Sequence, residues 1–362
     1  MQWGDTNFVI SSWVVQLYKV LMASINQTYI YVGLGSEGGQ EGHGLYRRPI
    51  SGGSWELKTK GLPDNPDVRD LALDPENASI LLCGTQDGVY QTTNQADHWE
   101  KLPLPGNPGT IWAVNYHPND PTTIYAGGED AALYRTTDSG LNWSRVPIEN
   151  ITFPSVTMKP QEMPKRILEI AVDPQLPQEI YAAIEVGGLI RTRDNGQTWE
   201  GVSEGHYQND DPVDLHSVLV DRSRPRHISI IARAGLFQST DGGDHWAPGN
   251  IRKLGRQGTY SRVIRELPGD PSTIFIGGGP EFRGSPGALF KSVDYGTTWN
   301  LVNMGISPNS TIFGFYINPR NTNQMFAGTR CGQVLGTLDG GNRWDDLSLP
   351  KDVSEINTLV CG

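Results

Sequence analysis

The chain has 362 residues, of which 19% are charged, and its formal net charge is −11. This acidic balance argues against a nucleic-acid partner, because binding to phosphates depends on clustered Lys and Arg side chains. Three cysteines without a CxxC pair give neither a disulfide framework nor a cysteine zinc site. No apolar run reaches the roughly 18 residues of a membrane helix, so we expect a soluble, cytoplasmic protein without a membrane partner.

Residues 1–24 are predicted to be an extension that precedes the folded domain. Their apolar stretch, residues 8–22, follows Met-Gln-Trp-Gly-Asp and therefore lacks the basic start of a secretory leader. Met22 offers an internal start, which would make residues 1–21 dispensable. In an alternative interpretation, residues 17–33 align without gaps on residues 68–84 and supply a first strand.

From residue 25 onward the sequence repeats a phrase of three short strands. An apolar strand leads to a D/N/H-P turn, a second strand ends in small residues, and a glycine loop precedes a third strand. Three copies show the pattern: LALDPENASILLCGTQDGVYQTT (71–93), VNYHPNDPTTIYAGGEDAALYRTT (114–137) and IAVDPQLPQEIYAAIEVGGLIRTR (170–193).

A second phrase, S/T-x-D-x-G-x-x-W, closes each repeat and predicts a turn into a fourth strand. The Asp accepts backbone N–H groups across the turn, the Gly supplies a positive φ, and the Trp covers a neighbouring blade. Five copies fit: TTDSGLNW (136–143), TRDNGQTW (192–199), STDGGDHW (239–246), SVDYGTTW (292–299) and TLDGGNRW (337–344). Two weaker copies precede them, RPISGGSW (48–55) and TTNQADHW (92–99).

The resulting tryptophans recur every 44 to 56 residues, a period typical of propeller blades: Trp55, Trp99, Trp143, Trp199, Trp246, Trp299 and Trp344. The closing phrase resembles the Asp-box, or BNR, repeat of sialidases, sortilin-type receptors, two-propeller xyloglucanases and photosystem II assembly factors. The resemblance covers residues 28–362. It implies an all-β, seven-bladed propeller of four-stranded antiparallel blades, which we expect as one monomeric domain over residues 25–362.

The two ends of the chain are predicted to meet in blade 1. The C-terminal segment SEINTLVCG (354–362) reads as an innermost strand without a blade of its own, and blade 1 begins at its second strand, TYIYVGLG (28–35). Placing the C-terminal strand in blade 1 closes the ring and leaves no exposed sheet edge.

An alignment of the innermost strands on the D/N/H-P turn predicts two rings of side chains around one mouth of the channel. Asp70 and Glu169 lie one position after the first ring and are expected to reach inward. The first ring is Arg69, Trp112, Leu168, His216, Arg262, Phe313 and Asn357, and the second is Asp67, Thr110, Arg166, Asp214, Tyr260, Thr311 and Glu355. Four long loops, residues 35–44, 144–166, 200–214 and 278–287, fall on this same face.

The polar and aromatic side chains of the two rings predict a small-molecule site at the channel mouth. The leading interpretation is a hydrolase or lyase that acts on a small anionic or aromatic substrate. His216, Glu169 and Asp70 are the candidate acid–base catalysts, and the ordinary pKa of a histidine such as His216 suits proton transfer near neutral pH. Arginines would hold a carboxylate and aromatic rings would form apolar walls. The expected substrate-binding residues are Arg69, Arg262, Trp112, Phe313, Tyr260, Arg233 and Arg330.

Other interpretations stay open at this stage. One is a protein-binding scaffold, as the resemblance to assembly factors implies, and another is a glycoside hydrolase of the sialidase or xyloglucanase kind. The xyloglucanases use two acids across a cleft between two propellers, whereas one propeller is predicted here. No cofactor is expected, although His43, His206 and His216 with Asp210 or Asp211 could hold a divalent metal. Alternatively, Arg69 and Arg262 pair structurally with Asp67, Asp70 or Glu169.

Overall fold

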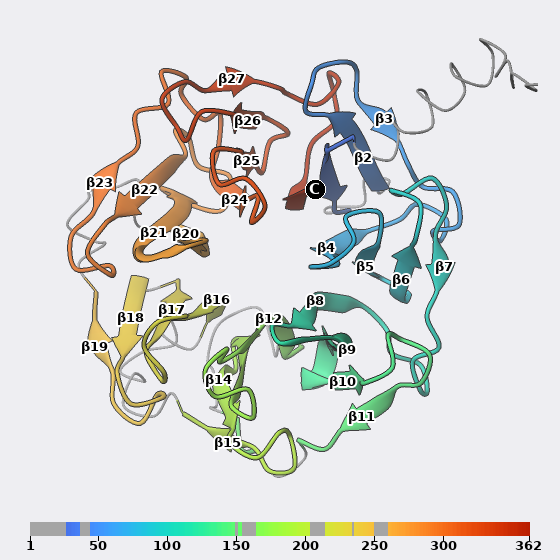
Figure 1. Cartoon of the computed structure of the whole chain (residues 1–362), viewed down its shortest axis with the longest axis vertical. Coiled ribbons are helices and arrows are strands. Elements are labelled where there is room, and N and C mark those ends of the chain that lie inside the picture. The colour runs from blue at the N-terminus through green and yellow to red at the C-terminus, as the bar shows by residue number, and fades with distance from the viewer. Residues whose placement is uncertain are drawn as a thin grey trace, which may run out of the picture.

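The computed structural model describes residues 27–36, 44–148, 151–153, 164–202, 214–233, 235–249 and 260–362. Seven four-stranded antiparallel sheets stand around a central channel like the blades of a propeller (Figure 1). Among the described residues the only helical element is the short 3-10 turn η1 (Glu129–Ala131). None of the helical structure seen there is long and apolar enough to cross a membrane. The predicted fold class is confirmed.

In each blade the strand nearest the channel is followed outward by three others, and the fourth is short and exposed. Blade 1 contains β28 (Ile356–Cys361), β1 (Tyr29–Leu34), β2 (Gly44–Pro49) and β3 (Glu56–Leu57). Blade 2 contains β4 (Val68–Leu73), β5 (Leu81–Thr85), β6 (Gly88–Thr92) and β7 (Glu100–Lys101). Blade 3 contains β8 (Ile111–His117), β9 (Asp120–Gly128), β10 (Leu133–Thr136) and β11 (Ser144–Val146). Blade 4 contains β12 (Arg166–Val172), β13 (Ile180–Glu185), β14 (Gly188–Thr192) and β15 (Glu200–Gly201). Blade 5 contains β16 (Leu215–Val220), β17 (Ile228–Ala232), β18 (Gly235–Ser239) and β19 (Ala247–Pro248). Blade 6 contains β20 (Tyr260–Leu267), β21 (Asp270–Gly279), β22 (Ala288–Ser292) and β23 (Asn300–Leu301). Blade 7 contains β24 (Ile312–Ile317), β25 (Met325–Thr329), β26 (Val334–Thr337) and β27 (Asp345–Asp346).

Blade 1 is completed by the C-terminal strand, as predicted. β28 pairs antiparallel with β1, with Ile30 opposite Cys361 and Val32 opposite Leu359. Tyr29 and Gly362 exchange two backbone hydrogen bonds of 2.8 and 3.0 Å beyond the strand ends. The red C-terminal strand lies beside the dark blue start of the domain in Figure 1. The alternative, in which residues 17–33 supply the innermost strand, is wrong, because β28 occupies that place.

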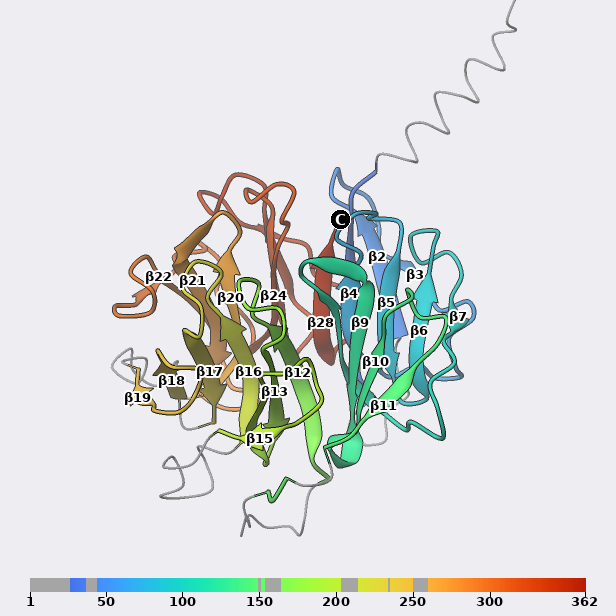
Figure 2. The same cartoon turned by 60° about the horizontal axis from the view of Figure 1, so that its bottom comes forward.

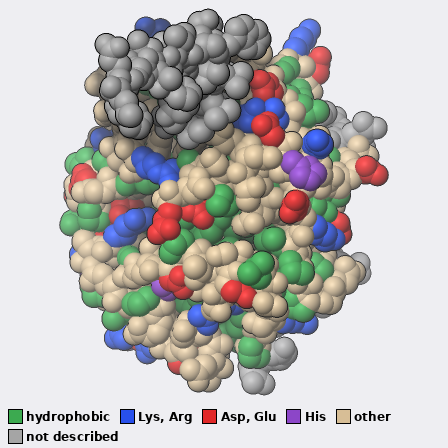
Figure 3. Space-filling view, turned by 45° about the vertical axis from the view of Figure 1, so that its right-hand side comes forward, with side chains coloured by type: hydrophobic (Ala, Val, Ile, Leu, Met, Phe, Trp, Pro, Cys, Tyr) green, Lys and Arg blue, Asp and Glu red, His purple; other side chains and the backbone are tan. Residues whose placement is uncertain are grey.

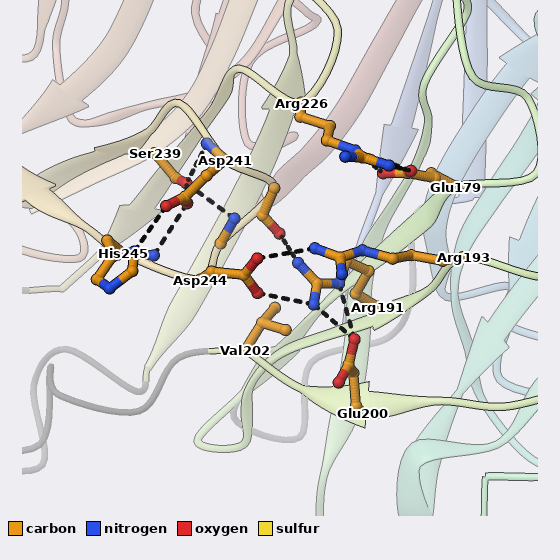
Figure 4. Close-up of polar contacts among 12 residues, drawn as sticks. Glu179, Arg191, Arg193, Glu200, Val202, Arg226, Ser239, Asp241, Asp244 and His245 are labelled. Atoms are coloured by element: carbon orange, nitrogen blue, oxygen red, sulfur yellow. Dashed lines mark hydrogen bonds and ion pairs between the residues drawn. The ribbon is translucent and has the colours of Figure 1, made fainter.

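The S/T-x-D-x-G-x-x-W turns close through their own side chains. In blade 5, Ser239 Oγ donates to Asp241 Oδ1 at 2.8 Å and accepts from Gly243 N, while His245 N donates to Asp241 Oδ1 at 2.9 Å (Figure 4). The other four full copies repeat these bonds. Surrounding donors, chiefly the Asn142 side chain, lower the pKa of Asp138 to about 2. The aspartates therefore stabilise turns.

The two weaker copies reach the same turn by other means. In residues 92–99, Asn94 takes the Asp position and accepts from Thr92 Oγ1 and from His98 N. In residues 48–55 neither the hydroxyl nor the Asp is present, and Arg48 Nε instead donates to Gly53 O at 2.8 Å. A departure from the motif in sequence thus leaves the blade architecture intact.

Hydrophobic packing between consecutive blades is organised around the motif tryptophans. Seven buried clusters each combine residues of two neighbouring blades, and each includes one of the seven tryptophans. Trp55, Trp99 and Trp246 also donate Nε1–H across the interface, to Leu347 O, Lys58 O and Val202 O of the preceding blade. Trp99, Trp299 and Trp344 are buried between blades as predicted, and the other four rings are partly buried and pack against their clusters.

A truncation tests the role of ring closure. Deleting residues 356–362 leaves β1 with an unpaired edge and removes one inner strand, so we expect loss of the monomeric fold and self-association. Size-exclusion chromatography with light scattering and circular dichroism measure the outcome. A peptide of residues 354–362 added in trans should restore the monomer by strand addition, whereas a scrambled peptide should not. A truncated chain as stable as the full chain would contradict this account.

Candidate functional site

Every innermost strand carries a β-bulge at the same position. In β4, for example, Val68 pairs with Thr85 and Asp70 with Gly84, so Arg69 is the extra residue. A bulge bends the strand and re-aims side chains, which allows two consecutive residues to approach the same side. The seven bulged residues form the first ring predicted from sequence: Arg69, Trp112, Leu168, His216, Arg262, Phe313 and Asn357.

A cavity of about 520 Å³ lies inside the channel, and all seven bulged residues line it. The lining continues down the strands to Pro75, Pro118, Pro174 and Pro319 at the turns that follow them. None of the second predicted ring lines it. The hollow therefore extends from the bulged ring toward the opposite face of the propeller, along the inner strands visible in Figure 2, rather than into the mouth above the ring.

Arginine and aromatic side chains pack together in one half of the mouth. The guanidinium groups of Arg69 and Arg166 lie over the Trp112 ring, at 4.1 and 4.4 Å from its centroid. Arg69 also pairs with Asp67, and Arg166 pairs with Glu185 at 3.0 Å. The expected structural pairing of Arg69 with Asp67 is thus present, and only 11% of the Arg69 side chain is exposed.

The other half of the mouth is filled in the same way around Phe313. Arg262 lies 5.0 Å and Arg330 4.9 Å from the centre of that ring, and the Phe282 ring packs edge-on against it. Arg330 is fully buried and pairs with Glu355 at 2.7 Å. Arg262 is 4.0 Å from Glu185, not paired with Asp70 or Glu169. These arginines hold the mouth together and offer a ligand little free surface.

His216 lies in the wall between the mouth and the cavity, and its side chain is 1% exposed. Its Nδ1 is 2.7 Å from Ser261 O, a contact that assigns the proton to Nδ1. Burial, with Arg262 nearby, holds the pKa of His216 well below its usual range. The ring also packs 5.1 Å from Tyr260, whose pKa burial raises. A neutral, enclosed imidazole is poorly placed to exchange protons with a ligand.

Asp70 lines the cavity directly after the bulged Arg69. Its Oδ2 accepts from Val114 N at 3.0 Å, and its Oδ1 accepts from Leu71 N and from Thr358 Oγ1. Burial raises the pKa of Asp70 to about 7, and the negative charge of Glu169 contributes, although the bond from Val114 N opposes the shift. This carboxyl group therefore changes protonation state near neutral pH.

Glu169 lines the same cavity from β12 and has a different environment. Its Oε1 is 2.8 Å from Arg265 Nη1, and its Oε2 accepts a hydrogen bond from Ser217 Oγ. The cavity thus contains one carboxyl group that carries a proton near neutrality and one in an ion pair. Arg265 was not among the residues predicted from sequence, because it lies three positions after the bulged Arg262, although an arginine within VIREL (263–267) is a visible signal.

The remaining predicted residues are dispersed. Arg233 is exposed at the turn between β17 and β18, away from the cavity lining. Of the metal candidates only His216 is described; His43, His206, Asp210 and Asp211 lie outside the described residues. Within the described part of the chain, no three His, Cys, Asp or Glu side chains gather as metal ligands do. On the face shown in Figure 3, acidic and basic side chains are interspersed.

No family model matches the chain, but several proteins resemble it. A xyloglucanase of Acetivibrio thermocellus is 25% identical over 371 residues, which cover 88% of this chain and 39% of the relative. The solved GH74 enzyme of Niastella koreensis has a TM-score of 0.61 at 18% identity, over 78% of this chain and 45% of that one. YCF48 bound to a D1 peptide has a TM-score of 0.55 at 16% identity, over 79% and 84%.

These similarities define the class: the protein is a seven-bladed β-propeller. Its sequence resembles that of the Acetivibrio thermocellus xyloglucanase, and it shares the propeller fold of the Niastella koreensis GH74 enzyme and of YCF48. The chain spans about two fifths of the length of the curated xyloglucanase that it matches. The suspected seven-bladed propeller class is therefore confirmed.

The raised pKa of Asp70 predicts a pH-dependent stability. The folded chain holds a proton that the unfolded chain releases above its ordinary pKa of 3.8, so stability contributed by this group falls as pH rises from 3.8 toward about 7. Asp70→Asn removes the titration. Relative to wild type, the unfolding free energy of Asp70→Asn should therefore increase by about 2–4 kcal/mol between pH 3.8 and about pH 7.

Urea unfolding at a series of pH values measures this difference. Replacing one carboxylate oxygen by an amide also disturbs the bonds from Val114 and Leu71, but that cost does not vary with pH. Asp64→Asn, at an exposed loop position, is the matched control and should show no such trend. Parallel pH curves for wild type and Asp70→Asn would contradict the shifted pKa.

Proposed function

We propose that the central cavity binds a short saccharide and that the protein cleaves a glycosidic bond there. The observation that carries the proposal is the pair of carboxyl groups, Asp70 and Glu169, which line one cavity in contrasting environments. Glycoside hydrolysis requires a protonated acid and an ionised carboxylate beside the same bond. The proposal restricts the predicted hydrolase or lyase to one that cleaves glycosidic bonds. It also places the site in the cavity below the bulged ring rather than in the mouth above it.

In this proposal Asp70 donates its proton to the leaving glycosidic oxygen. A pKa of about 7 keeps a large fraction of the group protonated near neutral pH and makes the proton easy to transfer. Glu169, held by Arg265 and Ser217, faces the positive charge that develops on the sugar ring and accepts a proton from the water molecule whose oxygen bonds to the anomeric carbon in place of the leaving oxygen. Trp112 and Phe313 in the bulged ring provide an apolar end wall.

The size of the site indicates a short substrate. A cavity of about 520 Å³ is within the range of small-molecule sites, and the inner strands surround it as the walls of a channel, a shape that favours a short saccharide over a polysaccharide lying across an open cleft. The xyloglucanase relative supports the reaction class. The chain spans only part of that relative, and both carboxyl groups of the proposed site, Asp70 and Glu169, belong to this one propeller.

Turnover of a panel of nitrophenyl glycosides and of xyloglucan oligosaccharides tests the proposal. Asp70→Asn should lower kcat by about 10²-fold or more, and the wild-type rate should fall as pH rises above about 7, because the acid loses its proton. Glu169→Gln should also inactivate, while Asp64→Asn should not. Equal rates for wild type and Asp70→Asn, or no binding and no turnover of any saccharide, would refute it.

A second candidate is a peptide-binding propeller. The match to YCF48 bound to a D1 peptide covers most of both chains, unlike the match to the xyloglucanases. On the mouth face, Arg233 is exposed, and the side chain of Arg283 is 48% exposed while it pairs with Glu355 at 2.6 Å, so both cationic groups lie at the surface that a peptide would meet. Peptide binding that is weakened by Arg283→Ala or Arg233→Ala, and not by Asp70→Asn, would favour this function.

A further inference from the structure

A recurring arginine fastens one blade to the next on the face that carries the motif turns. The residue eight positions before the motif Trp donates to the backbone carbonyl between the Asp and Gly positions of the following blade's motif. Arginines make this contact from blades 1, 3 and 4: Arg47 Nη1 to Gln95 O at 2.6 Å, Arg135 Nη1 to Asn195 O at 3.2 Å and Arg191 Nη1 to Gly242 O at 2.6 Å. We call this contact the arginine latch.

Carboxylates surround two of these latches. The guanidinium of Arg191 is 2% exposed and lies between Glu200 and Asp244, with its Nη2 2.9 Å from Asp244 Oδ1 (Figure 4). Arg47 pairs at equivalent positions with Glu56 at 3.0 Å and Asp97 at 3.2 Å. The space between these blades is thus built for a guanidinium cation.

Between blades 5 and 6 the latch position holds a shorter, neutral residue. Gln238 Nε2 donates to Tyr295 O at 2.9 Å, which is the equivalent carbonyl. A cavity of about 210 Å³ lies at this interface, lined by Gln238 together with His227, Ser229 and Tyr295. Because the Gln238 side chain is shorter than an arginine, it leaves space at this interface that an arginine latch would fill.

The same hollow is lined by a carboxylate where other blades have apolar side chains. Glu266 stands four residues after the bulge of β20, and its side chain is 5% exposed. Its Oε2 accepts from Arg222 N at 3.2 Å, but its Oε1 accepts no hydrogen bond from the described residues, with Arg222 Nε at 3.6 Å. The equivalent residues of the other inner strands are Leu73, Tyr116, Val172, Val220, Ile317 and Cys361.

A buried carboxylate oxygen without a hydrogen-bond donor is costly, and its burial raises the pKa of Glu266. The lining contains three acidic residues, Asp221, Glu266 and Asp294, and two basic ones, His227 and Arg224. Arg224 is paired with Asp221 at 2.6 Å, and Glu266 forms a longer ion pair with Arg222 at 3.6 Å. The charge and the open acceptor both favour a cationic donor as occupant.

We propose that the interface of blades 5 and 6 binds a small guanidinium ligand, such as an alkylguanidine or an exposed arginine side chain. The ligand takes the place that Arg47, Arg135 and Arg191 occupy at their interfaces, and Glu266 Oε1 accepts its N–H groups. This site is outside the central cavity and does not depend on the proposed function.

Replacing the missing side chain is the first test. Gln238→Arg supplies the guanidinium from the chain itself and should raise Tm by about 1–3 °C in differential scanning fluorimetry. The gain should vanish in the Gln238→Arg/Glu266→Gln double variant. Gln91→Arg is the matched control, because it occupies the latch position of blade 2, where Tyr116 stands in the place of Glu266. An equal or larger gain from Gln91→Arg would overturn the role of Glu266.

The second test uses methylguanidinium and its neutral analogue methylurea as probes in calorimetry. Methylguanidinium should bind wild type and Glu76→Gln, an exposed control on the turn after β4 of blade 2. It should bind Glu266→Gln and Gln238→Arg at least about tenfold more weakly. Methylurea should bind none of them measurably. Equal binding of methylguanidinium to wild type and Glu266→Gln, equal binding of both probes, or no binding of methylguanidinium to wild type would overturn the proposal.

Discussion

The propeller depends on one antiparallel pair, β28 with β1, which joins the parts of the described chain that are farthest apart in sequence. Until this pair forms, β1 has a free edge and blade 7 has no partner on its far side. The buried cluster between blades 7 and 1, which includes Ile30, Phe326 and Leu359, also requires it. A closed ring has no terminal blade, so each Trp cluster is covered on both sides.

Much of this architecture could be predicted from the sequence, because its determinants are local. A motif turn is closed by bonds within eight residues, so its letters reveal the blade, as at Ser239 and Asp241. The alignment also identified the ring of Arg69 and His216, because the D/N/H-P turns mark a common register. Asp70 was expected to reach inward, but the reason, a bulge at the same position in every blade, leaves no compositional mark.

The arrangement inside the channel could not be predicted in the same way, since it depends on contacts between distant residues. Phe282 lies in a loop 31 residues before Phe313, yet the two rings meet in the mouth and occupy space that the sequence assigned to a ligand. Arg265 pairs with Glu169 across 96 positions. Such pairs follow from ring geometry, and neither partner is unusual in its own strand.

The polar residues of the channel also connect blades whose inner strands share no backbone ladder. Asp70 of blade 2 accepts from Val114 of blade 3 and Thr358 of blade 1, and Asn357 donates to Val68 O. Placing such bonds beside a cavity lowers their desolvation cost compared with a dry core. The same placement leaves the carboxyl group of Asp70 within reach of a ligand. One feature of Asp70 therefore explains both its structural hydrogen bonds and its raised pKa. The bulge before it turns this polar side chain toward the boundary between neighbouring blades and the cavity.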